Sequence, residues 1–251
     1  MGFMNIDVPN IGTESPKLRR DRLSALLTAL RPVAAICAPD DPAAQVVITA
    51  STLVLRFQPG LAPEPEAAVA LRLESALPLA QTLRGAPDRL EVAFDDCPEL
   101  GALACVLANE ARASRCGASH AMARLAEAML IIALRRTIDN ASTAPGLLAG
   151  LSHPRLHRAL VAIHDSPGAR WTVESLANEA GMSRSRFMAS FSEAIGTSPM
   201  AYVAQWRLRL AQKALTEGVS LKDVARRSGY RSTAAFRRAL QRHPEGSPTD
   251  A

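Results

Sequence analysis

The chain has 251 residues, of which 48% are hydrophobic and 21% charged, and its formal net charge is +5. This composition supports a packed core and excludes wholesale disorder. No apolar run approaches the roughly 18 residues of a membrane span, and the first residues lack the pattern of a secretory signal. We therefore expect a cytoplasmic protein of one large or two smaller domains.

Charge is distributed unevenly along the chain. Residues 152–251 carry 15 Lys and Arg against 8 Asp and Glu, whereas residues 1–151 carry 14 against 16. A basic segment joined to a slightly acidic one indicates a nucleic-acid-binding module attached to a second domain.

Four cysteines occur in the chain, and none forms a CxxC pair. They are Cys37, Cys97, Cys105 and Cys116. We interpret them as free thiols in a reducing compartment, with a redox sensor as the alternative.

The first part of the chain predicts a small β-rich domain preceded by a helix. Residues 1–17 have little periodicity, and residues 24–32 predict a short amphipathic helix that stops before its proline. Residues 45–57 are β-branched and partly alternating, which predicts a strand. Residues 69–80 and 89–94 have the same character, and Pro and Gly separate these segments.

The pattern then becomes helical. Residues 100–114 predict one helix, and residues 118–138 predict a longer and more apolar one. Its stripe comprises Met122, Leu125, Met129, Ile132 and Arg136. So wide a stripe indicates burial on more than one side, either within its own domain or also in a homodimer interface. Residues 140–146 are the expected linker.

The C-terminal part predicts short helices, and the stretch SLANEAGMSRSRFMASF fits a helix-turn-helix unit. Thr172 is the expected N-cap of the first helix, and Ser183 that of the second. Gly181 can adopt the left-handed turn conformation, and Phe187 and Phe191 anchor the inner face of the second helix.

The same pattern recurs in VSLKDVARRSGYRSTAAFRRAL. Gly229 lies in the turn, Ser232 is the expected cap, and Phe236 and Leu240 repeat the four-residue anchor. Residues 201–215 predict a long helix between the two units. Two units in tandem within a basic module favour DNA binding over a helical bundle with a solvated basic face.

Three stretches, residues 171–187, 191–211 and 219–240, resemble the DNA-binding domain of the AraC/XylS family of bacterial transcription regulators. The resemblance implies a seven-helix domain with two helix-turn-helix units. It also implies that the linking helix holds two recognition helices in successive major grooves on one face of DNA.

The chain departs from the family pattern at one position in each recognition helix and in its final residues. Ala189 stands where the family usually has Arg, and Leu240 stands where it usually has Phe. The ending, QRHPEGSPTDA, is compressed and lacks the closing aromatic-Arg pair. These departures predict a short or frayed last helix, and with it either weaker DNA binding or a partner that compensates.

Residues 18–165 resemble the cupin-like sensor domain of one AraC subgroup, notably in DRLSALLTALRP and RLAEAMLIIALRR. The fold class is then α+β: a small incomplete β-barrel with flanking helices, followed by an all-α domain. We expect a sensor and dimerisation domain at residues 1–143 and the DNA-binding domain at residues 147–251. No His occurs between residues 1 and 119, which predicts no cupin metal, no cofactor and no cupin enzyme activity.

Phosphate contacts position such a protein, and contacts to base edges specify sequence. Ser185, Met188 and Ala189 are the expected base-facing positions of the first unit, where the apolar side chains can meet thymine methyls. In the second unit, Arg237 and Arg238 can reach guanine O6 and N7. The predicted DNA contacts are Arg184, Ser185, Arg186, Met188, Arg209, Arg231, Thr233, Arg237 and Arg238.

A basic cluster precedes the β-rich domain and consists of Lys17, Arg19, Arg20 and Arg22. Clustered arginines suit phosphates through charge-assisted bonds. The arrangement loosely resembles the arginine motif before PilZ barrels, which bind cyclic di-GMP, although the spacing is not RxxxR. A solvated basic turn is the alternative.

Three histidines, His153, His157 and His164, fall near one helical face, as they would in a metal site. No cysteine or carboxylate cluster accompanies them, so we interpret them as the surface of a linker helix.

The sequence therefore predicts a transcription activator whose partners are double-stranded DNA, RNA polymerase and a second copy of the chain. An effector such as cyclic di-GMP would control it, and the alternatives are a regulator without a small-molecule ligand or a redox-responsive one. No P-loop, GxGxxG, nucleophile-elbow or HExxH pattern supports an enzyme. A nucleoid protein would not need the separate sensor.

Overall fold

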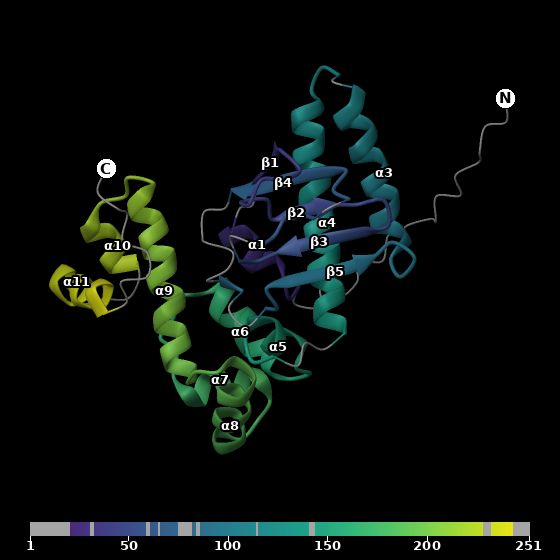
Figure 1. Ribbon diagram of the computed structural model, residues 1–251. Coiled ribbons are helices and arrows are strands. Elements are labelled where there is room, and N and C mark those ends of the chain that lie inside the picture. Colours follow the sequence, from purple (N-terminus) through teal and green to yellow (C-terminus); the bar gives the residue numbers. More distant parts are fainter. Residues whose placement is uncertain are drawn as a thin grey trace, which may run out of the picture.

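The computed structural model describes most of the chain between residues 21 and 242. Within that range the undescribed residues are 31–32, 59–60, 65, 75–81, 84–85, 114, 141–143 and 228–231. Figure 1 shows a sheet backed by two long helices, followed by a series of helices that extends away from it. This arrangement confirms the α+β fold class.

Five antiparallel strands form one sheet in the order β1-β4-β2-β3-β5. Their bounds are β1 Val33–Cys37, β2 Val46–Ile48, β3 Thr52–Arg56, β4 Val69–Glu74 and β5 Arg89–Ala93. Residues 45–57 thus form two strands rather than one, because the hydroxyls of Thr49 and Thr52 lie 2.8 Å apart in the turn between them. The described strands leave β1 and β5 as edges, so the expected incomplete barrel is an open sheet.

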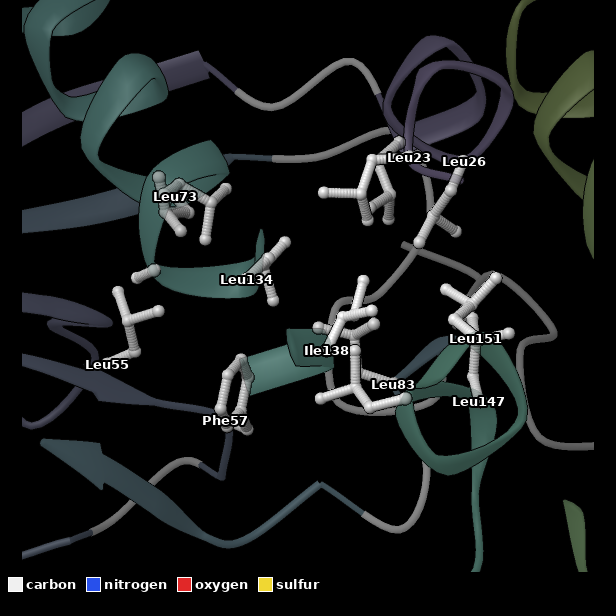
Figure 2. Packing of buried hydrophobic residues seen from close by; sticks show 14 of the residues in the cluster. Leu23, Leu26, Leu55, Phe57, Leu73, Leu83, Leu134, Ile138, Leu147 and Leu151 are labelled. Atoms are coloured by element: carbon white, nitrogen blue, oxygen red, sulfur yellow. The ribbon is translucent and has the colours of Figure 1, made fainter. Parts of the chain in front are cut away.

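Both faces of the central strands β2 and β3 are buried, which explains why these two strands are nearly continuously apolar. One face holds Leu53, Leu55 and Leu71, all at most 1% exposed, and belongs to the main core. Figure 2 shows Leu55 beside Leu134 and the other core residues of the helical layer. The opposite face carries a small second cluster, which consists of Ala44, Val47, Val54 and Ala70.

The helices α3 (Pro98–Ala113) and α4 (Ala118–Asp139) form an antiparallel pair that packs on the sheet (Figure 1). Gly117 has φ +82°, and this left-handed turn lets the chain reverse into α4. The central residues Met129, Leu130, Ala133 and Leu134 are fully buried within the single chain. The protein's own domain therefore covers the centre of α4, whereas Leu125 and Ile132 of the predicted stripe are only partly buried.

Seven further helices make up the C-terminal part. They are α5 Leu147–Ser152, α6 Leu156–Asp165, α7 Val173–Ala180, α8 Arg184–Ile195, α9 Pro199–Thr216, α10 Leu221–Arg227 and α11 Thr233–Arg242. The main core continues from the sheet through α5 and α6 to Trp206 of α9. A separate cluster, built around Phe236, joins the end of α9 to α10 and α11.

The helix α1 (Ser24–Leu30) lies between the sheet domain and the C-terminal helices. Figure 2 shows Leu26 of α1 near Leu151 of α5. Two long-range hydrogen bonds connect this part of the chain to the C-terminal helices. Arg22 Nη1, just before α1, donates to the carbonyl of Leu151 in α5 at 3.3 Å, and Lys213 Nζ of α9 donates to the carbonyl of Ala29 in α1 at 2.9 Å. Among the described helices, none is both long and apolar enough to cross a membrane.

Candidate nucleic-acid interface

The first helix-turn-helix unit consists of α7 and α8, and its turn forms as the sequence predicts. Thr172 and Ser175 make a reciprocal capping box, in which Thr172 Oγ1 accepts from the Ser175 N–H at 3.1 Å. Gly181 ends α7 at φ +63°, a conformation that glycine adopts without steric cost. Leu176 and Ala180 are fully buried, so α7 presents its inner face to the core.

Two aromatic rings fix α8 in place. Phe187 and Phe191 are fully buried with their centroids 5.4 Å apart, and Phe191 meets Tyr202 of α9 edge-on at 5.8 Å. Ser183 occupies the N-cap position with extended backbone, but its hydroxyl makes no capping hydrogen bond. The inner face predicted for this helix is confirmed.

The outer face of α8 points into solvent. The exposed residues of α8 are Arg184, Ser185, Arg186, Met188, Ala189, Ser192 and Glu193. Met188 is 39% exposed, which is unusual for a large apolar side chain in this protein. The N-terminal half of this face, residues 184–189, therefore presents one serine hydroxyl and two guanidinium groups beside a small apolar patch.

Arg184 forms an ion pair across the unit. Its Nε lies 2.8 Å from Oε1 of Glu174 in α7, and both side chains are more than 60% exposed. An ion pair this exposed contributes roughly 0–1 kcal/mol. A phosphate can therefore replace Glu174 as the partner of Arg184 at low cost.

The second unit consists of α10 and α11. Ser232 caps α11, because its Oγ accepts from the Ala235 N–H at 3.1 Å. Phe236 is fully buried, and Leu240 is a partly buried member of the same small cluster. The predicted cap and anchor are thus present, whereas Gly229 lies outside the described residues.

The predicted contacts of the second unit lie on the outer side of α11. Arg237 and Arg238 are exposed, Thr233 is partly buried, and the neighbouring Ala234 is exposed. Arg231 lies outside the described residues. The described part of this face carries two adjacent guanidinium groups, in contrast to the small and apolar side chains of α8.

Helix α9 separates the two units. Figure 1 shows α8 near one end of α9 and α10 near the other, with α11 beside α10. Its 18 residues correspond to a length of about 27 Å, comparable with the spacing of roughly 34 Å between successive major grooves. Trp206 in its middle is 1% exposed, which confirms it as a core residue. Arg207 braces α9 against the loop before α7 by donating to the carbonyls of Pro167 and Ala169, each at 2.6 Å.

His164 is buried against α9 rather than on a linker surface, so that prediction is wrong. Its Nε2 lies 2.7 Å from the hydroxyl of Tyr202, and its ring lies 4.3 Å from that of Trp206. Burial lowers the pKa of His164 to about 3, and the charge of Arg209 adds to this effect. Position 164 lies four residues after Leu160 on the same helix face, a spacing that could have predicted its burial.

The side chains of the other two histidines, His153 and His157, form hydrogen bonds with backbone groups a few residues away. His153 Nδ1 accepts from the N–H groups of Arg155 and Leu156, both at 3.1 Å, at the start of α6. His157 Nδ1 lies 3.0 Å from the carbonyl of His153. The part of the chain that the structure describes holds no group of three or more His, Cys, Asp or Glu that could bind a metal ion.

The basic cluster proposed for an anionic ligand falls mostly outside the described residues, which include neither Lys17, Arg19 nor Arg20. Arg22 is described, and it donates to the carbonyl of Leu151. Arg209, predicted as a DNA-backbone contact, is half-buried and lies near the His164–Tyr202 pair.

These elements define a protein with two helix-turn-helix units at the ends of one helix. Residues 176–251 match a family model described as a helix-turn-helix domain. The chain is 45% identical over 102 residues to the HTH-type transcriptional regulator AlkR of Acinetobacter baylyi, covering 40% of this chain and 33% of AlkR.

Other relatives agree. A Streptomyces antibioticus protein described as an AraC-like transcription regulator is 34% identical over 180 residues, which are 69% of this chain and 57% of that protein. The RCS-specific HTH-type transcriptional activator RclR of Escherichia coli is 32% identical over 137 residues, 54% of this chain and 48% of RclR. The chain thus spans about a third to just over half the length of these relatives. All three are described as transcription regulators or activators, and the Streptomyces protein as AraC-like, so the C-terminal part of the chain is similar to AraC-like transcription regulators.

Proposed function

We propose that this protein is a sequence-specific DNA-binding transcription regulator of the bacterial cytoplasm. The observation that carries the proposal is the pair of helix-turn-helix units at opposite ends of α9, each with an exposed outer helix face that bears arginines. A single rigid helix fixes the separation of the two units, so both can enter successive major grooves on one face of the duplex.

The two recognition helices have different tasks in this proposal. Helix α8 anchors the protein through phosphate contacts of Arg184 and Arg186, and its apolar patch meets thymine methyls. Helix α11 distinguishes base pairs through Arg237 and Arg238, because arginine pairs with guanine O6 and N7. The charge of residues 152–251 supports binding to a polyanion.

The N-terminal domain receives the controlling signal in this proposal, and a second copy of the chain and RNA polymerase are further partners. The continuous core and the bond from Lys213 to Ala29 support a mechanical connection between that domain and α9. An effector that shifts α1 would therefore change how firmly α9 is held.

Genome-wide binding followed by footprinting tests the proposed function. A regulator protects a discrete site of about two major-groove turns upstream of its target genes. Broad protection without a preferred site would overturn the proposal in favour of a nucleoid protein.

Cyclic di-GMP stays our hypothesis for an anionic effector, supported by the basic cluster from Lys17 to Arg22. Isothermal titration tests it directly, with the double variant Arg19→Ala and Arg20→Ala as the matched control. Heat in the original protein that disappears in the variant supports the hypothesis. No heat, or equal heat in both, removes it and favours the ligand-free or cysteine-based alternatives.

A further inference from the structure

A buried arginine lies in the N-terminal sheet. Arg56, the last residue of β3, is only 1% exposed. Its Nη2 donates to the carbonyl of Leu61 and, at 3.1 Å, to that of Ala62. Its Nε and Nη1 have no hydrogen-bond partner among the residues that the structure describes. The three N–H bonds on these two nitrogens are therefore buried without acceptors.

The neighbouring carboxylates are already engaged. Arg89 lies opposite Arg56 in the sheet register. Glu64 binds Arg89 in a bidentate manner, with distances of 3.0 and 3.2 Å, and Glu91 pairs with the same arginine. Among the described residues, none places a carboxylate within ion-pair distance of Arg56.

This arrangement is costly unless an acceptor completes it. A buried ion without hydrogen-bonded compensation loses several kcal/mol of solvation, and unpaired buried polar atoms in native proteins require an explanation such as a bound ion. The side chain of Arg56 shares a face of β3 with Val54, because residues two apart on a strand point the same way. Val54 belongs to the small apolar cluster of Ala44, Val47, Val54 and Ala70.

We propose that Arg56 binds a small organic carboxylate on this second face of the sheet, and that this carboxylate is an effector of the N-terminal domain at a site separate from the basic cluster proposed for cyclic di-GMP. The carboxylate oxygens accept from Nε and Nη1 of Arg56. The inference rests on the proposed function, because only a regulator needs an effector.

Thermal unfolding with sodium acetate as the probe tests binding. Sodium chloride at equal ionic strength is the reference, since chloride lacks the paired oxygens of a carboxylate. Acetate should raise the Tm by about 3–6 °C at ten times its dissociation constant, and the Tm should go on rising with the logarithm of the acetate concentration. An equal rise with sodium chloride, or none with acetate, would overturn the proposal.

Two variants separate the site from general effects. Arg56→Lys keeps the charge but loses the planar fork, and it should abolish the acetate-dependent rise. Arg124→Gln changes an exposed arginine of α4 and should leave that rise intact. Saturation-transfer NMR detects binding of acetate to the original protein directly, so this result does not depend on whether Arg56→Lys folds. An absence of transfer would contradict the proposal.

DNA binding distinguishes the two proposals. Acetate should change the affinity of the protein for its footprinted site at least threefold at constant ionic strength, and Arg56→Lys should lose this response. A thermal shift with unchanged DNA affinity would overturn the effector role. Failure to find any specific site would instead overturn the proposed function.

Discussion

The buried imidazole of His164 makes the stability of the protein depend on pH. In the unfolded chain a histidine has a pKa near 6.5, whereas burial between α6 and α9 lowers the pKa of His164 to about 3. Between these values the unfolded chain binds a proton that the folded chain does not. Stability is therefore full above pH 6.5 and falls as the pH drops from 6.5 toward 3.

The magnitude follows from the two pKa values. Lowering the pH from 7.5 to 5.5 should cost about 1.4 kcal/mol of unfolding free energy through His164 alone. For a chain of this size that corresponds to a fall in Tm of about 3–6 °C. The pKa values of His153 and His157 are also lowered by burial, so they add to the effect in the same direction.

Urea or thermal unfolding of the full chain at pH 7.5 and 5.5 measures this effect. His164→Phe removes the titrating group. The variant should therefore lose about 1.4 kcal/mol less unfolding free energy between the two pH values than the original protein does. Tyr202→Phe is the matched control, because it removes the hydroxyl at 2.7 Å but leaves His164 buried. Equal pH dependence in His164→Phe and the original protein would refute the reasoning.

Three further predictions concern the recognition helices and their packing. Substituting Arg237 or Arg238 with Ala should relax base preference by about 1–3 kcal/mol in a footprint with mismatched sites. Arg184→Ala should instead weaken binding to all sequences alike. A uniform loss of affinity in all three variants would show that the roles are misassigned. Gly150→Val should lower stability by about 1–3 kcal/mol, because a Cβ there would lie 2.7 Å from Leu160 Cδ1, and unchanged urea unfolding would contradict this. Thr172→Ala should cost about 1 kcal/mol through the lost cap, and an unchanged urea midpoint would count against it.

Local signals in the sequence predicted the first helix-turn-helix unit closely. The cap at Thr172, the glycine turn and the two phenylalanines each depend on neighbours within a few residues, so composition and spacing suffice. The same holds for Ser232 and Phe236 in the second unit. Strand β5 was likewise predicted within a residue of its end.

Long-range packing could not be predicted in this way. The burial of His164 depends on α9, which lies about forty positions further along the chain, as the hydrogen bond to Tyr202 shows. Strand β1 was not singled out, because it lies at an edge with three of its five residues exposed and alternates poorly. The contact of Lys213 with Ala29 joins residues 184 positions apart and has no local signal.

The sequence also left open what surrounds the apolar stripe of α4. In the structure its central residues are fully buried by the sheet and α3, so a homodimer interface there is not needed to cover them. Dimerisation stays a prediction, and sedimentation of the full chain measures it. The exposed side of α3, where Val106 is 52% exposed, stays accessible in the single chain.

The central claim is that α9 holds two recognition helices at one fixed spacing on DNA. Selection of binding sites from random duplexes, followed by affinity measurements on spacing variants of the selected site, tests it most directly. The account predicts two contact elements about 10 bp apart, and an insertion of about 5 bp between them should turn one element to the opposite face. Affinity should then fall to the level of non-specific DNA. Full affinity after this insertion would contradict the claim.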